Sequence, residues 1–321
     1  MFFGRKKPDG KTLLLLDIEQ GSVGSALVHL SDEGPRLFGQ MRSHTRILPT
    51  RDSKSLLHEV KLAARKAVDH AASLAARLRN ATGERSGTLH ALGQISGAAA
   101  FYGAPWGVPS LSSGSPHFVD EMQDAIHNML DEVLPAVPRR SYSAAGALVG
   151  GASRVLPHNT YLLVLAGGEI TELIVLKEGA ALGYATAPVG RFALARTLRA
   201  HGISDAEIQS LVRTDAMGAL REPLEAASGH WAREVANAAS PLMRQAPVRH
   251  VWVVAHGEEG ERHATQLAQA LEHSDEFSSL FPQGGELRAL RGHMLGEHVI
   301  THAPAADLTL SLQALYGDAL W

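Results

Sequence analysis

The sequence contains no cysteine. This absence excludes disulfide bonds, thiolate metal sites, iron–sulfur clusters and a cysteine nucleophile. It also agrees with a reducing cytoplasm, which is where we expect the protein to lie.

The sequence also lacks a strong excess of charge of either sign. Lysine and arginine total 30 and aspartate and glutamate total 33, so the formal net charge is −3. Nucleic-acid binding needs a concentrated positive field, and we therefore expect no nucleic-acid partner. No apolar run approaches the roughly 18–20 residues that span a bilayer. The start, MFFGRKKPDGK, lacks the apolar segment of a signal peptide.

What is present is ordinary material for a globular protein. The chain has 321 residues, of which 45% are hydrophobic and 20% are charged. At about 150 residues per domain, this length predicts two domains. We place the first at 1–157 and the second at 158–303.

Two segments share one pattern, a buried strand followed by a glycine-bearing turn and a returning strand. The first is Thr12–Leu30 and the second is Tyr161–Leu182, which contains Gly167 and Gly168. A repeated unit of this kind suggests duplicated domains. A third apolar strand, 249–255, ends in His256 and Gly257.

The clearest helix is predicted between Ser53 and Asn80, where apolar residues recur at helical spacing. Its other face carries cations that form either a solvated surface or a membrane or partner surface: Lys54, Lys61, Arg65, Lys66, Arg77 and Arg79. Leu89–Phe101 is predicted to be a strand, and it leads into a loop rich in glycine, proline and serine.

Turns of this kind suit anions, because glycine lets the backbone approach a phosphate and free amides act as donors. With three such turns in order, the chain resembles the actin-like ATPase superfamily, and within it the FtsA proteins of cell division and the PilM proteins of type IV pili. DIEQGSVGSALVHL resembles the first phosphate hairpin, AGGEITELIVLKEG the second, and VWVVAHGEEG the adenosine motif. PVGRFALARTLRAHGISDAEIQSLV and FYGAPW also resemble FtsA or PilM segments.

The resemblance implies an α/β, actin-like (ribonuclease-H-like) fold with two α/β domains flanking a cleft. It also implies that a closing helix at 304–321 packs back on the first domain. It implies that Asp17 is the catalytic carboxylate. By the same resemblance the nucleotide-binding residues are Gly21, Ser22, Val23, Gly24, Gly167, Gly168, Glu169, Thr171, Gly190, Glu207, His256 and Gly257. The resemblance implies that the cofactor is ATP with Mg²⁺.

The sequence departs from the family pattern in all three motifs. Glu19 stands where a glycine usually follows Asp-Ile, and Leu165 stands where the second hairpin usually carries an aspartate. Glu172 takes the place of a common aspartate, and the third motif has one glycine, Gly257, where two or three are usual. These changes indicate a weak or inactive ATPase.

Two functions remain open at this point. The first is a cytoplasmic scaffold or adaptor of the FtsA/PilM type, which docks on membrane-bound or cytoskeletal proteins in division or pilus-type assembly and can self-associate. The second is an active ATPase or small-molecule kinase of the same superfamily, which needs a carboxylate near the transferred phosphate. Phe2, Phe3 and the following cations are either a disordered leader or a foot for peripheral contact with the inner membrane.

Other chemistries find little support. Two histidine groups could be imagined as metal ligands, His293, His298 and His302 with Glu297, and His256 with His263, but their spacings are only loosely helical and we expect no metal site of this kind. A Gly-x-Ser-x-Gly elbow and a P-loop Gly-Lys-Ser/Thr motif are both missing.

Overall fold

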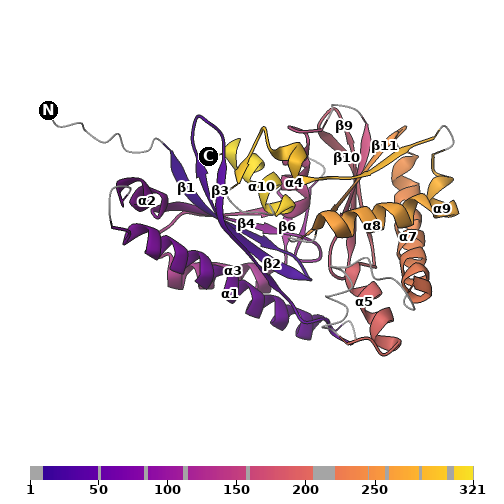
Figure 1. The fold of residues 1–321 in the computed structure, drawn as a ribbon, viewed down its shortest axis with the longest axis horizontal. Helices are drawn as coiled ribbons and strands as arrows, with labels where there is room; N and C mark the ends of the chain where they lie inside the picture. The colour runs from indigo at the N-terminus through magenta and orange to yellow at the C-terminus, as the bar shows by residue number, and fades with distance from the viewer. Residues whose placement is uncertain are drawn as a thin grey trace.

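The computed structural model describes residues 10–49, 52–82, 86–110, 115–156, 160–204, 221–244, 246–256, 260–281, 284–301 and 307–320. Two mixed β-sheets and the helices around them make up this part of the chain, as expected for an actin-like α/β fold (Figure 1). The domain boundaries at 157/158 and 303/304 remain a prediction.

The first sheet has six strands in the order β13-β3-β2-β1-β4-β7. The first three strands along the chain form an antiparallel meander, and β4 and β7 then add in parallel to β1. The strands are β1 (Lys11–Ile18), β2 (Ser22–Leu30), β3 (Arg36–His44), β4 (Ile95–Tyr102), β7 (Arg139–Ser143) and β13 (Ile300–Thr301).

Helices cover both faces of this sheet. One face carries α1 (Ser53–Arg79) and α3 (Asp120–Val133), with α2 (Ser86–Leu92) beside α1; the other carries α4 (Ala144–Ala152) and α10 (Leu308–Asp318). A short pair, β5 (Gly107–Val108) and β6 (His117–Phe118), lies between β4 and α3 in the chain. Asp52 caps the N-terminus of α1: its carboxylate accepts a hydrogen bond from the Ser55 amide at 2.8 Å.

The second sheet has five strands in the order β10-β9-β8-β11-β12. The strands are β8 (Tyr161–Ala166), β9 (Thr171–Lys177), β10 (Ala180–Ala187), β11 (His250–Ala255) and β12 (Glu286–Ala289). Its helices are α5 (Arg191–Ala200), α7 (Arg221–Met243), α8 (Gly260–Glu272) and α9 (Asp275–Ser278). The 3-10 turn η2 (Gly292–Leu295) follows β12 and packs against α10. Among the described residues, none of the helices is long and apolar enough to cross a membrane.

The run Leu13–Leu16 is continuously apolar because both faces of β1 are buried. Leu14 and Leu16 pack toward α1, whereas Leu13 and Leu15 pack toward α4 and α10. The core on the latter side also takes residues from β8 and β11 of the second sheet, so α4 and α10 lie between the two sheets (Figure 1). The strand alternation therefore directs Asp17 toward α10.

One local prediction was wrong. Leu89–Phe101 was expected to be a single strand, but Ser86–Leu92 forms helix α2 and the strand begins only at Ile95. The helical start follows from the sequence SGTLHAL, whose Gly93 and Gln94 then end the helix, since their amides donate back to Leu89 and Ala91.

Candidate functional site

The turns of the two glycine-bearing hairpins contact each other. A Cβ atom on Gly168 would lie 2.7 Å from both the Cα and the amide nitrogen of Gly21. A Cβ on Gly190 would lie 2.4 Å from the Gly168 carbonyl oxygen. Glycine at these three positions therefore lets backbone approach backbone at the junction of the two hairpins.

Glu19 joins the two hairpins through both carboxylate oxygens. Oε2 accepts the Gly168 amide at 2.9 Å, and Oε1 accepts Ser22 Oγ at 2.9 Å and Arg191 Nη2 at 3.0 Å. The side chain is only 3% exposed. Burial alone would raise the pKa of Glu19, but His256 and Arg191 outweigh it, so the pKa lies below its ordinary value and the carboxylate is charged.

Gln20 makes a second connection between the hairpins. Its Oε1 accepts the amides of Glu169 at 2.7 Å and Ile170 at 2.9 Å, and its Nε2 donates to the Ala104 carbonyl. Thr45 Oγ1 donates to the Gln20 carbonyl at 2.8 Å. The Gln20 side chain is thus held from the first sheet while it caps the amides of the second hairpin.

Asp17 belongs to a row of residues across the first sheet. It lies opposite Gly24 on β2, and Gly24 lies opposite Arg42 on β3. The Arg42 guanidinium passes over Gly24, where a Cβ would be 2.7 Å from Nη2, and donates to Asp17 Oδ2 at 2.7 Å. The fold therefore requires glycine at position 24, because a side chain there would displace Arg42.

Helix α10 supplies further partners to Asp17. Gln313 Nε2 donates to Oδ1 at 2.6 Å, and Thr309 Oγ1 donates to Oδ2 at 3.1 Å. Arg42 Nε also pairs with Asp307 at 2.6 Å, and Asp307 caps α10 by accepting the Leu310 amide at 3.2 Å. Asp17 and Arg42 are 0% and 2% exposed, so this is a buried ion-pair network.

The second sheet reaches the network through His256, which follows β11. His256 Nδ1 lies 3.1 Å from Asp17 Oδ2, and the His256 carbonyl accepts Arg191 Nη1 at 3.4 Å. Burial alone would raise the pKa of Asp17, but His256 and Arg42 outweigh it and hold the pKa well below its usual range. Burial would lower the pKa of His256, and Asp17 and Glu19 reverse this and raise it.

The two carboxylates of the second hairpin, Glu169 and Glu172, are both bound by protein groups. These groups come from the same half of the chain and from the residues that follow β4. Glu169 makes a bidentate pair with Arg196, at 2.6 and 2.7 Å. Glu172 lies opposite Leu165 in the strand pair, and its two oxygens accept the Ala104 amide at 3.1 Å and the Tyr184 hydroxyl at 2.8 Å. Burial raises the pKa of Glu172.

The structure brings most of the predicted site residues to one place. Asp17, Gly21, Ser22, Gly24, Gly167, Gly168, Glu169, Gly190 and His256 all lie at the junction of the hairpins. Val23 packs in the core under α1, and Thr171 bonds to Val189 and Trp231 inside the second half of the chain. Glu207 and Gly257 lie outside the described residues.

Three residues of this junction were not predicted from the sequence: Arg42, Arg191 and Gln20. The two arginines offset the charges of Asp17 and Glu19, and the neutral Gln20 accepts hydrogen bonds from amides of the second hairpin. Arg42 was overlooked because β3 itself was not predicted. A signal was present: Arg191 directly follows Gly190 at the start of α5, beside the second hairpin. Among the described residues, no group of three histidine, aspartate or glutamate side chains could hold a metal ion.

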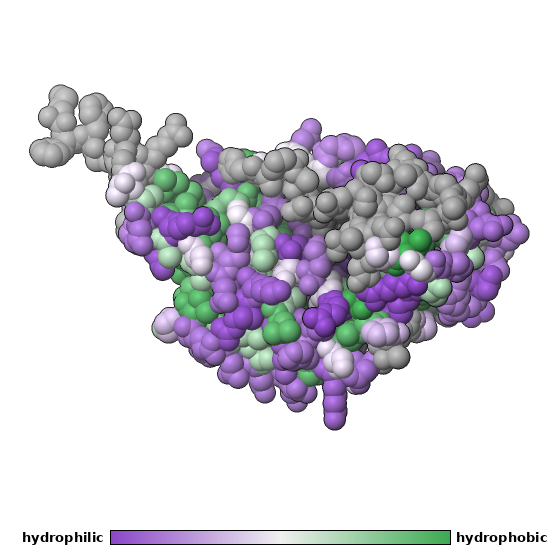
Figure 2. Space-filling model, turned by 60° about the horizontal axis from the view of Figure 1, so that its bottom comes forward, coloured by the Kyte–Doolittle hydropathy of each residue, from purple (hydrophilic) through white to green (hydrophobic). Residues whose placement is uncertain are grey.

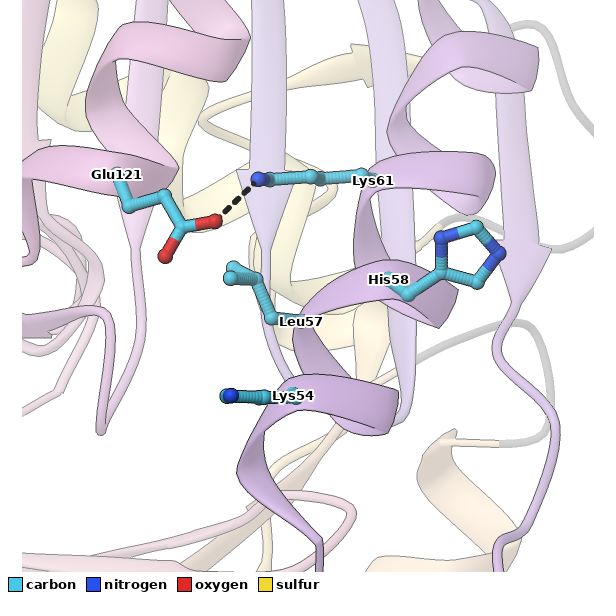
Figure 3. Close-up of a pocket in the computed structure, with 5 residues that line it drawn as sticks. All are labelled: Lys54, Leu57, His58, Lys61 and Glu121. Carbon is cyan, nitrogen blue, oxygen red and sulfur yellow. Dashed lines mark hydrogen bonds and ion pairs between the residues drawn. The ribbon is translucent and has the colours of Figure 1, made fainter.

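Apart from the buried junction, the surface has a hollow on the cationic side of α1. Lys54, Leu57, His58 and Lys61 of α1 and Glu121 of α3 line a shallow hollow of about 300 Å³ (Figure 3). Lys61 Nζ pairs with Glu121 Oε1 at 2.8 Å, and Arg65 pairs with Glu132 at 2.7 Å. Figure 2 shows hydrophobic residues on one face in small separate groups among hydrophilic ones.

The chain is similar in structure to several proteins of known structure. It is similar to one chain of the PilM–PilN type IV pilus biogenesis complex, with a TM-score of 0.58 and 13% identity, covering 95% of this chain and 98% of that chain. The ethanolamine utilization protein EutJ from Carboxydothermus hydrogenoformans gives a TM-score of 0.53 with 16% identity, covering 96% and 89%.

A ROK family glucokinase from Streptomyces griseus, in complex with glucose and AMPPNP, gives 0.51 with 12% identity, covering 96% and 98%. No protein-family model matches the chain, and no curated protein matches its sequence. At these identities the similarity establishes the fold: the chain has the actin-like ATPase fold.

Proposed function

We propose that this protein is an actin-fold cytoplasmic scaffold or adaptor of the FtsA/PilM type that acts at the inner membrane in cell division or pilus-type assembly. Its partners would be membrane-bound or cytoskeletal proteins. Of the weak and the inactive ATPase that the sequence leaves open, we propose the inactive one, because protein groups already bind both oxygens of Asp17. The likeness in fold to a pilus biogenesis complex supports the scaffold reading, although that likeness also extends to a kinase.

The observation that carries the proposal is the environment of Asp17. Both of its oxygens already accept hydrogen bonds from protein groups, including Arg42, Thr309 and Gln313. Mg²⁺ prefers oxygen ligands and keeps several waters when it binds nucleotide. An Mg²⁺ beside Asp17 would lie next to the Arg42 guanidinium, so the residues present do not fit an ATP–Mg²⁺ complex.

The alternative is an active ATPase or small-molecule kinase. It requires a carboxylate in the second hairpin that can serve the transferred phosphate or its metal. Leu165 provides none, and both oxygens of Glu172 are committed to the Ala104 amide and the Tyr184 hydroxyl. Glu169 is held by Arg196. The missing carboxylate at Leu165 and the bound carboxylates of Glu172 and Glu169 all support the scaffold over the enzyme.

Turnover separates the two functions. Phosphate release is measured with MgATP on the wild-type chain and on Asp17→Ala, with a heat-inactivated sample as background. The scaffold proposal expects background release from both. Turnover in the wild type that disappears in Asp17→Ala would establish the enzyme and overturn the proposal.

The adaptor role needs its own experiment. The 321-residue chain is sedimented with inner-membrane vesicles from its own host, before and after the vesicle proteins are stripped by protease. An adaptor docked on membrane proteins sediments with intact vesicles and stays in the supernatant with stripped ones. Sedimentation with stripped vesicles would instead indicate direct lipid contact, and no sedimentation with either would contradict the adaptor role.

A further inference from the structure

The turn between β8 and β9 presents three successive backbone amides to the first hairpin. The amides of Gly168, Glu169 and Ile170 all donate to oxygens of Glu19 or Gln20. Successive backbone amides in a turn form a concave nest that binds anions. Here the oxygens in the nest come from the protein itself.

We propose that Glu19 and Gln20 are a built-in occupant of this amide nest, standing where a phosphate or another oxyanion would otherwise bind, and that their contact holds the two hairpins together without nucleotide. The inference deepens the proposed function and rests on it, because a scaffold that does not turn over ATP needs contacts other than those to a nucleotide to hold its two hairpins together.

Glu19 has the set of partners that a bound oxyanion would have. Its carboxylate is bound by a backbone amide, by the Arg191 guanidinium and by the Ser22 hydroxyl, at 2.9 to 3.0 Å. Charge-assisted hydrogen bonds of this kind are about twice as strong as neutral ones. A buried carboxylate is costly unless it is fully paired, and this one is.

Other contacts hold the nest and its occupant in place: the start of α5 binds the turn that forms the nest, and Ala104 and Thr45 bind Gln20. The amides of Arg191 and Phe192, at the start of α5, donate to the carbonyls of Gly167 and Gly168 at 2.9 and 2.8 Å. The Gly167 and Gly168 carbonyls therefore face α5, while the amides of Gly168, Glu169 and Ile170 face the first hairpin. Gln20 is held in turn by the Ala104 carbonyl and Thr45.

The test measures amide hydrogen exchange at Gly168, Glu169 and Ile170 in the full chain. In Glu19→Ala/Gln20→Ala, exchange at these amides is expected to rise about tenfold or more, because each amide loses its acceptor: the charged Glu19 carboxylate for Gly168, and the neutral Gln20 oxygen for Glu169 and Ile170. The matched control is Glu33→Ala/Gln94→Ala, which removes the same side chains at exposed positions of the same half of the chain. The control is expected to leave the three amides unchanged.

Inorganic phosphate provides the second measurement. It is expected to raise the melting temperature of the double variant, whose nest is empty, and to leave that of the wild type unchanged. Unchanged exchange in the double variant would overturn the proposal, and so would a wild type that responds to phosphate as strongly as the variant.

Two further points keep the test decisive. If the double variant does not fold, Gln20→Ala alone removes the acceptor of the Glu169 and Ile170 amides, and faster exchange at these two amides is then expected. The outcome is also separate from that of the proposed function: ATP turnover by the wild type contradicts the scaffold, whereas unchanged amide exchange contradicts the built-in occupant.

Discussion

His256 Nδ1 lies 3.1 Å from Asp17 Oδ2 and so joins the end of a strand in the second sheet to the end of a strand in the first. Arg42 and Asp307 extend this contact to β3 and to the start of α10. Four segments that are far apart in the sequence therefore meet in one buried ionic network.

Arg42 is expected to be essential for stability. Arg42→Met leaves the carboxylates of Asp17 and Asp307 buried without their guanidinium, and breaking a buried pair in this way costs about 3–5 kcal/mol. Arg36→Met is the matched control on the same strand, because Arg36 and Glu33 are 40% and 71% exposed. We expect the control to cost less than about 1 kcal/mol in urea denaturation. Equal losses in the two variants would contradict the account of the network.

Stability is expected to fall on both sides of neutral pH. The pKa of His256 is raised above 6.5, so its contribution is fully present below pH 6.5 and is lost as the pH rises through the raised pKa. The pKa of Asp17 and that of Glu19 are lowered, so their contributions are present above 3.8 and 4.5 and are lost as the pH falls through the lowered values. Arg42 and Glu172 also face His256.

The measurement is the urea midpoint of the wild type and of His256→Gln across the pH range. His256→Gln is expected to be less stable below pH 6.5 and to lose the alkaline decline, while the acid decline persists. An alkaline decline of the same size in His256→Gln would show that another group causes it.

Gly168→Ala tests the close approach of the two hairpins. The added Cβ would lie 2.7 Å from backbone atoms of Gly21, which cannot move aside as a side chain can. We expect a loss of about 1–3 kcal/mol from this overpacking. Gly229→Ala is the control, since Gly229 lies within α7 with nothing within 4 Å, and alanine there should stabilise the helix by up to about 1 kcal/mol. Thermal melts measure both changes: the melting temperature should fall in Gly168→Ala and stay the same or rise in Gly229→Ala.

Two buried glutamates are expected to respond in opposite ways to the same substitution. Glu19→Gln removes a charge that His256 and Arg191 stabilise, so at pH 7 it should cost about 1–3 kcal/mol. Glu172→Gln removes a charge that burial disfavours, and it should be neutral or stabilising. Comparable destabilisation by both substitutions would contradict the charge assignment at the hairpin junction.

The hairpins themselves could be predicted from the sequence, because an apolar run and its glycine turn are adjacent in the chain. The roles of single residues could not. Gly24 looks like a residue that makes room for a phosphate, yet its neighbour is Arg42, and this neighbour depends on the β2–β3 register. Gln313 looks like an ordinary helix residue until α10 is placed against β1.

The departures from the family pattern were visible in the sequence, but their meaning was not. From the sequence, Glu19 could be recognised only as a carboxylate in the place of a family glycine. The structure shows where its charge is compensated, by Arg191 and the Gly168 amide, and both of these lie far from it in the sequence. β3 was missed for a related reason, since its partly exposed, mixed sequence RLFGQMRSH carries no clear apolar pattern.

The central claim is that protein side chains, not a nucleotide, occupy the junction of the two hairpins. Isothermal titration of the full chain with MgATP tests it most directly. The account predicts no saturable heat in the wild type. One-site saturable binding that is lost in Asp17→Asn would contradict it.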